Sequence, residues 1–144
     1  MKHTVIKHAF VEFIPETIED GTLYVSIPYA TAVHKCFCGC GREVVTPLSP
    51  TDWQLAFDGR TVSLYPSVGS WNLPCRSHYW IRRDRVESAP QWSRRRIEAE
   101  RSRDRHVKEA YFESGEDTKA PDQAKRSASR ESIRRRLTRW WSGR

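Results

Sequence analysis

The sequence predicts a mainly β fold: a small antiparallel meander stapled by a metal site, followed by a helical and partly disordered basic tail. Three observations lead to this prediction. Short runs that alternate β-branched or aromatic residues with polar ones fill residues 1–89. Three of the four cysteines fall within five positions, in the segment HKCFCGC. Residues 91–112 contain neither Gly nor Pro and many good helix formers.

The alternating runs define the strands. Residues 3–15 and 21–29 flank an acidic turn and predict a first hairpin. Asp58-Gly59, between two further alternating runs, predicts a second hairpin. Residues 78–89 predict one more pair of strands around Asp84. We therefore expect six short strands in a β domain that spans residues 1–89.

The remaining residues divide into three segments. We expect an arginine-rich helix over residues 90–113, a flexible polar linker over 114–130 and an amphipathic basic helix over 131–144. The terminal helix would dock on a partner or, alternatively, lie on an anionic membrane surface. The whole net charge of +7 lies beyond residue 91, because the first 91 residues are balanced. This asymmetry predicts an anionic partner for the tail.

The sequence offers no membrane-spanning or secretory segment. It contains no run of 18 apolar residues, and acidic residues and Pro15 interrupt the N-terminal stretch before a signal-peptide core forms. We expect a cytoplasmic protein with no transmembrane segment. Reduced thiols fit that compartment better than disulfides.

The cysteines predict a zinc site. Zinc takes four tetrahedral ligands, mainly thiolates and imidazoles. The candidate ligands, of which four are expected to bind, are Cys36, Cys38, Cys40, Cys75 and His78. Bound zinc would clamp two loops at one end of the sheet. An iron-sulfur or oxidised arrangement and plain buried thiols are the alternatives. A structural role for the zinc is favoured because the chain has no H-E-x-x-H or H-x-E motif. A catalytic role for the zinc is the alternative.

A second candidate site is the shaped segment between the metal loops. Ser67 lies between Pro66 and Val68-Gly69, where a serine hydroxyl and backbone amides could face outward. It is the candidate nucleophile. His34 or His78 would serve as its base if the metal loops bring either one close. The alternative for Ser67 is a turn serine that bonds its own backbone.

Two motifs carry a resemblance to a known family. The segments HKCFCGCGREVVTPLSPTDWQLAFDG and VSLYPSVGSWNLPCRSHYWI, with their C-x-C-G-C-G and P-C-x-S-H-Y-W-I motifs, resemble a small bacterial zinc-binding domain family of unknown function. Its genes lie beside those for ubiquitin-like proteins and E1-like adenylating enzymes. The resemblance covers residues 20–90. It implies a place in a bacterial ubiquitin-like conjugation pathway, with the modifier or its conjugating enzymes as partners.

Within that pathway the resemblance favours a peptidase that processes or removes the modifier, with Ser67 and His34 as catalytic candidates or the zinc as a water activator. A zinc-stapled adaptor without catalytic activity is the first alternative. A nucleic-acid-binding protein is the second, because the tail is basic and several arginines lie near aromatic residues. These arginines are Arg76, Arg82, Arg83 and Arg85.

Overall fold

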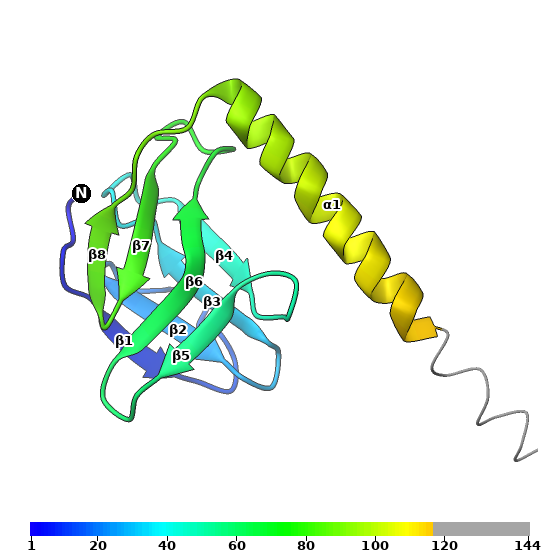
Figure 1. Cartoon of the computed structure of the whole chain (residues 1–144). Coiled ribbons are helices and arrows are strands. Elements are labelled where there is room, and N and C mark those ends of the chain that lie inside the picture. Colours follow the sequence, from blue (N-terminus) through cyan, green and yellow to red (C-terminus); the bar gives the residue numbers. More distant parts are fainter. Residues whose placement is uncertain (117–144) are drawn as a thin grey trace, which may run out of the picture. The chain divides into compact units, whose positions relative to one another are not determined.

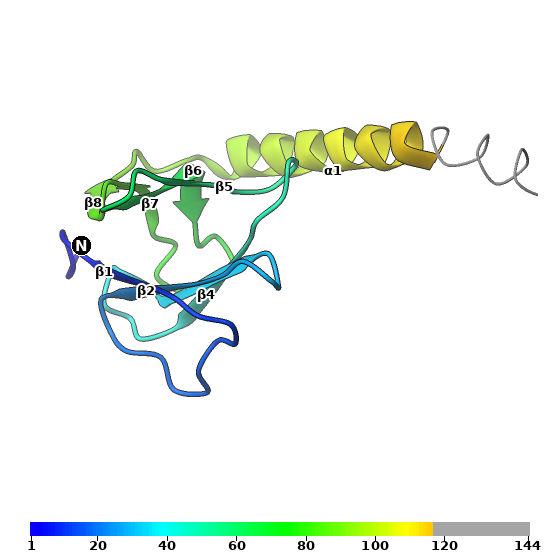
Figure 2. The same cartoon turned by 90° about the horizontal axis from the view of Figure 1, so that it is seen from below.

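The computed structural model describes residues 1–116, and its β domain is built from two four-stranded sheets (Figure 1). The first sheet has the order β1-β2-β3-β4, with β1 Lys7–Phe10, β2 Thr22–Ser26, β3 Thr31–Lys35 and β4 Glu43–Pro47. The second has the order β5-β6-β7-β8, with β5 Gln54–Phe57, β6 Val62–Gly69, β7 His78–Arg82 and β8 Arg85–Ser88. Figure 2 shows the two sheets as stacked layers. The prediction of a mainly β fold is confirmed.

The first predicted hairpin is wrong, because β1 and β2 pair in parallel, from Lys7 opposite Thr22 to Phe10 opposite Val25. Because parallel strands begin at the same end of a sheet, a long connection must carry the chain from the end of the first strand back to that end. Residues 11–21 supply it. Their Ile18 is only 2% exposed and packs in an apolar cluster with residues of β2 and β3, so this segment covers the sheet and is not a tight turn.

The two other predicted hairpins are confirmed. Between β5 and β6, the carboxylate of Asp58 accepts hydrogen bonds from the backbone amides of Arg60 and Thr61, and Gly59 has a φ of 91°. Between β7 and β8, Arg83 and Asp84 have φ values of 49° and 58°. Positive φ at both central residues is typical of the turns that match the twist of paired strands.

The hairpin formed by β3 and β4 was not predicted. These strands are antiparallel, with Val33 opposite Val45, and residues 36–42 form the turn between them. The backbone N–H of Cys36 donates to the carbonyl of Arg42 at 2.7 Å and closes this turn. Three cysteines therefore lie at the tip of a hairpin. With this hairpin included, the described residues contain eight strands where six were expected.

Asp84 links the two sheets. Its Oδ1 accepts a hydrogen bond from the backbone N–H of Val62 at 3.0 Å, in the second sheet. The same carboxylate lies 3.0 Å from Nδ1 of His8, in β1 of the first sheet. This part-buried carboxylate accepts hydrogen bonds from both sheets and so fixes their relative position. Leaving a buried amide such as that of Val62 unpaired would cost about 1–3 kcal/mol.

The core lies between the sheets, where apolar side chains of both are buried; its largest fully buried members are Tyr79, Phe37, Leu23, Leu64 and Ile81. His34 is also fully buried. Its ring stacks on Phe37 with centroids 4.4 Å apart, and its Nε2 lies 2.8 Å from Oη of Tyr79. Burial lowers the pKa of His34 to about 3, so the ring is neutral at neutral pH.

The helix α1, Arg94–Glu116, was predicted over residues 90–113. Ser93 begins it as an N-cap, its Oγ accepting from the backbone N–H of Arg96 at 3.3 Å. The compact unit that holds both sheets extends from Met1 to Glu100 and includes the first turns of α1, where Ile97 is 6% exposed. No helix within residues 1–116 is long and apolar enough to cross a membrane.

Most of the predicted tail lies outside the described residues. The predicted linker over residues 114–130 starts inside α1, and its part from residue 117 onward is not described. The predicted amphipathic helix over residues 131–144 lies entirely outside them.

Because the pKa of His34 is lowered, the unfolded chain takes up a proton at this residue below pH 6.5 while the folded chain stays neutral down to about pH 3. The stability that this neutral ring contributes is complete above pH 6.5 and is lost as the pH falls toward 3. We expect His34→Gln, which cannot titrate, to lose less stability than the wild type between pH 7 and pH 5.5. The difference should approach about 1 kcal/mol.

Urea unfolding of both proteins at the two pH values, with metal present in excess, measures this difference. Thr46→Val, which removes a buried hydroxyl that cannot titrate in this range, is the control and should follow the wild type. Parallel pH dependence of His34→Gln and the wild type would contradict the prediction.

Candidate functional site

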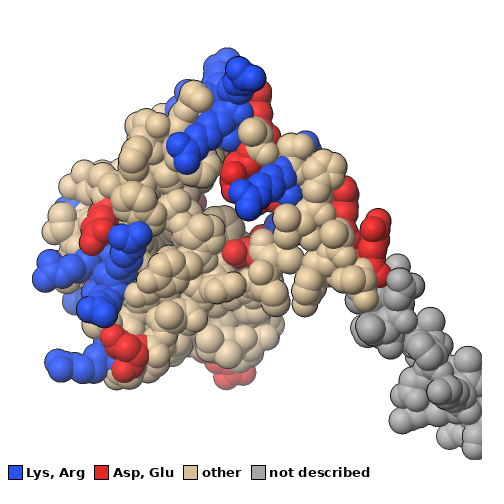
Figure 3. Space-filling view, viewed as in Figure 1, with Lys and Arg blue, Asp and Glu red and all other residues tan. Residues whose placement is uncertain are grey.

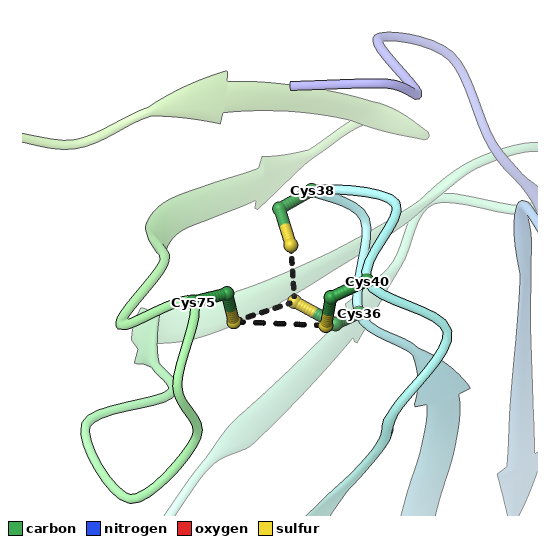
Figure 4. A group of neighbouring side chains, drawn as sticks. All are labelled: Cys36, Cys38, Cys40 and Cys75. Carbon is green, nitrogen blue, oxygen red and sulfur yellow. Dashed lines mark hydrogen bonds between the residues drawn. The ribbon is translucent and has the colours of Figure 1, made fainter.

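Four cysteines converge between the two sheets. Cys36, Cys38 and Cys40 come from the turn between β3 and β4, and Cys75 from the loop between β6 and β7 (Figure 4). Their Sγ atoms all lie within 4.8 Å of one another. The Sγ of Cys36 is 3.3 Å from that of Cys38 and 3.9 Å from that of Cys75, and Cys40 is 3.6 Å from Cys75.

These distances fit one metal ion. Thiolates bound to a tetrahedral ion at about 2.3 Å stand about 3.8 Å apart, close to the spacing observed. All four cysteines are free thiols, and no other set of His, Cys, Asp or Glu within residues 1–116 offers a metal site. The four cysteines therefore form a candidate metal site without a histidine.

The backbone of the hairpin turn creates this arrangement. Gly39 and Gly41 have φ values of 95° and 75°, which side chains other than glycine rarely allow. The backbone N–H of Gly39 donates to the carbonyl of Cys36 at 3.0 Å. The turn thereby brings the cysteines at alternate positions to one side, where Cys75 of the other loop meets them.

The electrostatics of the cysteines differ. Burial raises the pKa of Cys38 to about 12. Burial also acts to raise the pKa of Cys75, but hydrogen bonds from the amide and hydroxyl of Ser77 and from the thiols of Cys40 and Cys38 together lower this pKa to about 7. Four thiolates this close repel one another, so a cation is required to keep them all deprotonated.

His78, a candidate ligand, lies outside the cysteine cluster and contacts Ser67. Its Nε2 is 2.8 Å from Oγ of Ser67, and its Nδ1 is 2.7 Å from the backbone carbonyl oxygen of Pro90. A carbonyl oxygen only accepts, so Nδ1 carries the proton and Nε2 is the unprotonated nitrogen. The Ser67 hydroxyl therefore donates to Nε2, the arrangement that general-base activation of a serine requires.

The imidazole of His78 is held by aromatic side chains. The residue is 5% exposed, and its ring centroid lies 4.9 Å from that of Trp71, 5.0 Å from Trp92 and 6.4 Å from Trp80. Trp71 also crosses the backbone of Gly69 so closely that a Cβ there would overlap the Nε1 of the indole. Packing thus fixes the ring in the orientation that both hydrogen bonds need.

Ser67 lies in strand β6, where a turn was expected. The pairing of β6 with β7 shifts register between Leu64 and Val68 and then continues with Gly69 opposite His78. Such a bulge re-aims the side chains near it. Ser67 is half-buried, and the hydrogen bond of its hydroxyl goes to His78 instead of to its own backbone.

The structure places His34 in the core beside the cysteine cluster, not beside Ser67. Its partner Tyr79 also donates toward the Sγ of Cys36 at 4.0 Å. Burial, followed by the neighbouring Cys36, raises the pKa of Tyr79, so the phenol keeps its proton and remains a donor. His34 is thus linked through Tyr79 to the candidate metal site.

The cysteine cluster and the Ser67–His78 pair meet at the start of β7. Oγ of Ser77 is 3.0 Å from Sγ of Cys36, and Ser77 directly precedes His78. The backbone N–H of Ser70 donates to the carbonyl of Ser77 at 2.8 Å, which closes the loop that carries Cys75. The loop that supplies one cysteine therefore also fixes the ends of both strands that carry Ser67 and His78.

Three contributors to this site were not predicted. The Pro90 carbonyl is a backbone group that any residue could supply, so the sequence carries no signal for it. Trp71 and Trp92 do not stand out in the sequence, because tryptophans in a small β domain are most simply core residues. Alternation along β7 gave the available signal, since it places His78 and Trp80 on the face opposite Tyr79.

Comparison with known proteins addresses what such a site does. A family model described as "Bacterial ubiquitination-like system serine protease (BubE)" matches residues 10–89. The match includes all four cysteines, Ser67 and His78. Comparisons with curated proteins and with solved structures gave no match. Because the family model covers more than half of the chain and the resemblance noted in the sequence points the same way, the protein belongs to the BubE family and is a component of a bacterial ubiquitination-like system.

Proposed function

We propose that this protein is a serine peptidase that processes or removes the ubiquitin-like modifier of its pathway, with Ser67 as nucleophile and His78 as general base. The observation that carries the proposal is the 2.8 Å contact between Oγ of Ser67 and the unprotonated Nε2 of a buried, oriented imidazole. The serine protease description of the family supports it.

In the proposed mechanism, Oγ of Ser67 attacks the scissile carbonyl carbon while its proton moves to Nε2 of His78. The resulting imidazolium then gives this proton to the leaving group, and the acyl group remains on Ser67 as an ester. Water attacks the ester with His78 again as base and restores the serine. The Pro90 carbonyl keeps Nδ1 protonated throughout and orients the ring, a role that a carboxylate fills in many serine proteases.

His78 thereby takes the role first suggested for His34, because His34 is buried in the core and paired with Tyr79. We further propose that Cys36, Cys38, Cys40 and Cys75 bind zinc, which suits a set of four thiolates. Four protein ligands leave no open position for water, so the zinc would supply a structural crosslink and not a hydroxide. It would join the turn between β3 and β4 to the loop that leads into His78.

The pathway implies the substrate and the partners. A modifier that is conjugated through its C-terminus must be trimmed before use or released afterwards, and both reactions cleave an acyl bond at that terminus. We propose that this tail is the substrate and that the enzyme acts in the cytoplasm.

Ser67→Ala should abolish cleavage of a C-terminally extended ubiquitin-like protein from the same operon, lowering the rate by a factor on the order of 10³ or more because the nucleophile is lost. His78→Gln should have a similar effect. Ser88→Ala, at an exposed position of strand β8, is the matched control and should cleave normally. Intact mass of the substrate before and after incubation measures the reaction, and thermal unfolding confirms that each variant folds.

Each other outcome points to a different function. Cleavage by the wild type and by Ser67→Ala alike would assign the chemistry to the metal site. Binding of the modifier without cleavage by any of the proteins would support the adaptor. Binding of nucleic acid, steeply weakened by salt, in place of the modifier would support the third candidate function.

Removal of the metal should both destabilise the domain and stop catalysis, since one crosslink supports the core and the strand that carries His78. We expect about one zinc ion per chain by elemental analysis, and loss of that zinc, a lower unfolding temperature and loss of cleavage in Cys75→Ser. Arg42→Ala, an exposed position in the same turn that holds three cysteines, should retain zinc and activity. A zinc-free protein that unfolds at the wild-type temperature and keeps its activity would refute this role.

A further inference from the structure

Two arginines lie on the rings that surround His78. Cζ of Arg82 stands 4.8 Å from the ring centroid of Trp80, and Cζ of Arg96 stands 4.4 Å from that of Trp92. Trp80 and Trp92 both contact the imidazole of His78. All of these residues belong to the compact unit Met1–Glu100. Two guanidinium groups are therefore fixed at short distances from the Ser67–His78 pair.

Stacking leaves the hydrogen-bonding edge of an arginine available. The guanidinium N–H groups lie in its plane, so a face placed on an indole ring does not occupy them. The Arg82 side chain is 46% exposed and reaches Glu87 only at 3.4 Å. Arg96 is exposed. Both side chains are thus held in place and still able to bind an anion.

The surface between the arginines is mostly uncharged. Figure 3 shows basic side chains over β7 and β8 and over the first turns of α1, with mostly tan surface between these two places. Tyr65, two positions before Ser67, is 48% exposed, and Trp80 is half-buried. This middle region offers exposed aromatic surface, onto which an extended peptide without charge could pack.

We infer that Arg82 and Arg96 bind carboxylates of an acidic protein substrate on either side of the peptide segment that reaches Ser67. This inference rests on the proposed function and specifies its substrate: a modifier with an uncharged extended tail and acidic residues that flank it. Arginine recognises carboxylates through two parallel hydrogen bonds, and fixed guanidinium groups give up little conformational entropy on binding. The proposed cleavage at Ser67 requires an acyl substrate such as a peptide, which favours a protein over a nucleic acid.

The double variant Arg82→Gln/Arg96→Gln tests the inference. With the C-terminally extended ubiquitin-like protein as substrate, we expect KM to rise about tenfold with kcat unchanged, because the arginines act in binding and not in proton transfer. KM of the wild type should rise with salt, and this rise should be weaker in the variant, since two charge contacts are gone. Arg60→Gln, an exposed arginine in the turn between β5 and β6, is the control and should match the wild type.

An unchanged KM in the double variant would overturn the inference. A loss of kcat with constant KM would also overturn it, since the arginines would then only hold the tryptophans around His78. Tighter binding of a single-stranded oligonucleotide than of the modifier, lost in the same variant, would assign the arginines to nucleic acid instead.

Two further measurements separate this inference from the proposed function. Labelling of Ser67 by a fluorophosphonate reports on the Ser67–His78 pair without any protein substrate. The dissociation constant of the modifier for Ser67→Ala, with and without the arginine substitutions, reports on the arginines without catalysis. Weaker binding in the substituted protein would support the arginine contacts even if no labelling or cleavage occurred, and equal binding would overturn them.

Discussion

The joining of two loops by four thiols is the constraint on which the rest of the site depends. A β domain of this size has a thin core, and the cluster ties the β3–β4 turn to the loop before β7. That loop holds Cys75 and ends at Ser77, whose carbonyl accepts from Ser70 and whose hydroxyl contacts Cys36. The register that sets Gly69 opposite His78 begins there. Structural support and the proposed chemistry are therefore not separable in this protein.

The proposed base has an unusual environment for its role. His78 is buried, bonded at Nδ1 to a neutral carbonyl and enclosed by three tryptophans. A carboxylate at Nδ1 would stabilise the imidazolium more strongly, whereas a carbonyl supplies orientation and a dipole. Such a pair should suit a reactive or well-positioned acyl bond, as at an extended protein tail.

Local sequence patterns predicted the features that depend on neighbouring residues. Asp58-Gly59 and the segment around Asp84 form the expected hairpins because turn geometry is decided within a few residues. The cysteine spacing likewise indicated a metal site. The two segments that contain β1 and β2 were expected to pair, but their parallel direction was missed because alternation does not encode strand direction, and a covered connection looks like a turn. His34 and His78 could not be ranked either, since the pairing of His34 with Tyr79 and the contact of His78 with Ser67 arise only when the sheets pack.

The backbone that follows residue 89 contributes one contact to the proposed site. The match ends at Ala89, yet the acceptor for Nδ1 of His78 is the carbonyl of the next residue. Any residue can supply a carbonyl, so what must be kept is the route of the backbone. Two contacts fix that route: the amide of Ala89 donates to the carbonyl of His78 at 2.9 Å, and Trp92 stacks on Trp71 with centroids 5.7 Å apart. The same route carries Arg96 to its position over Trp92. The segment that leads into α1 therefore belongs to the proposed site, and a domain cut at residue 89 would lack the group that sets the tautomer of its base.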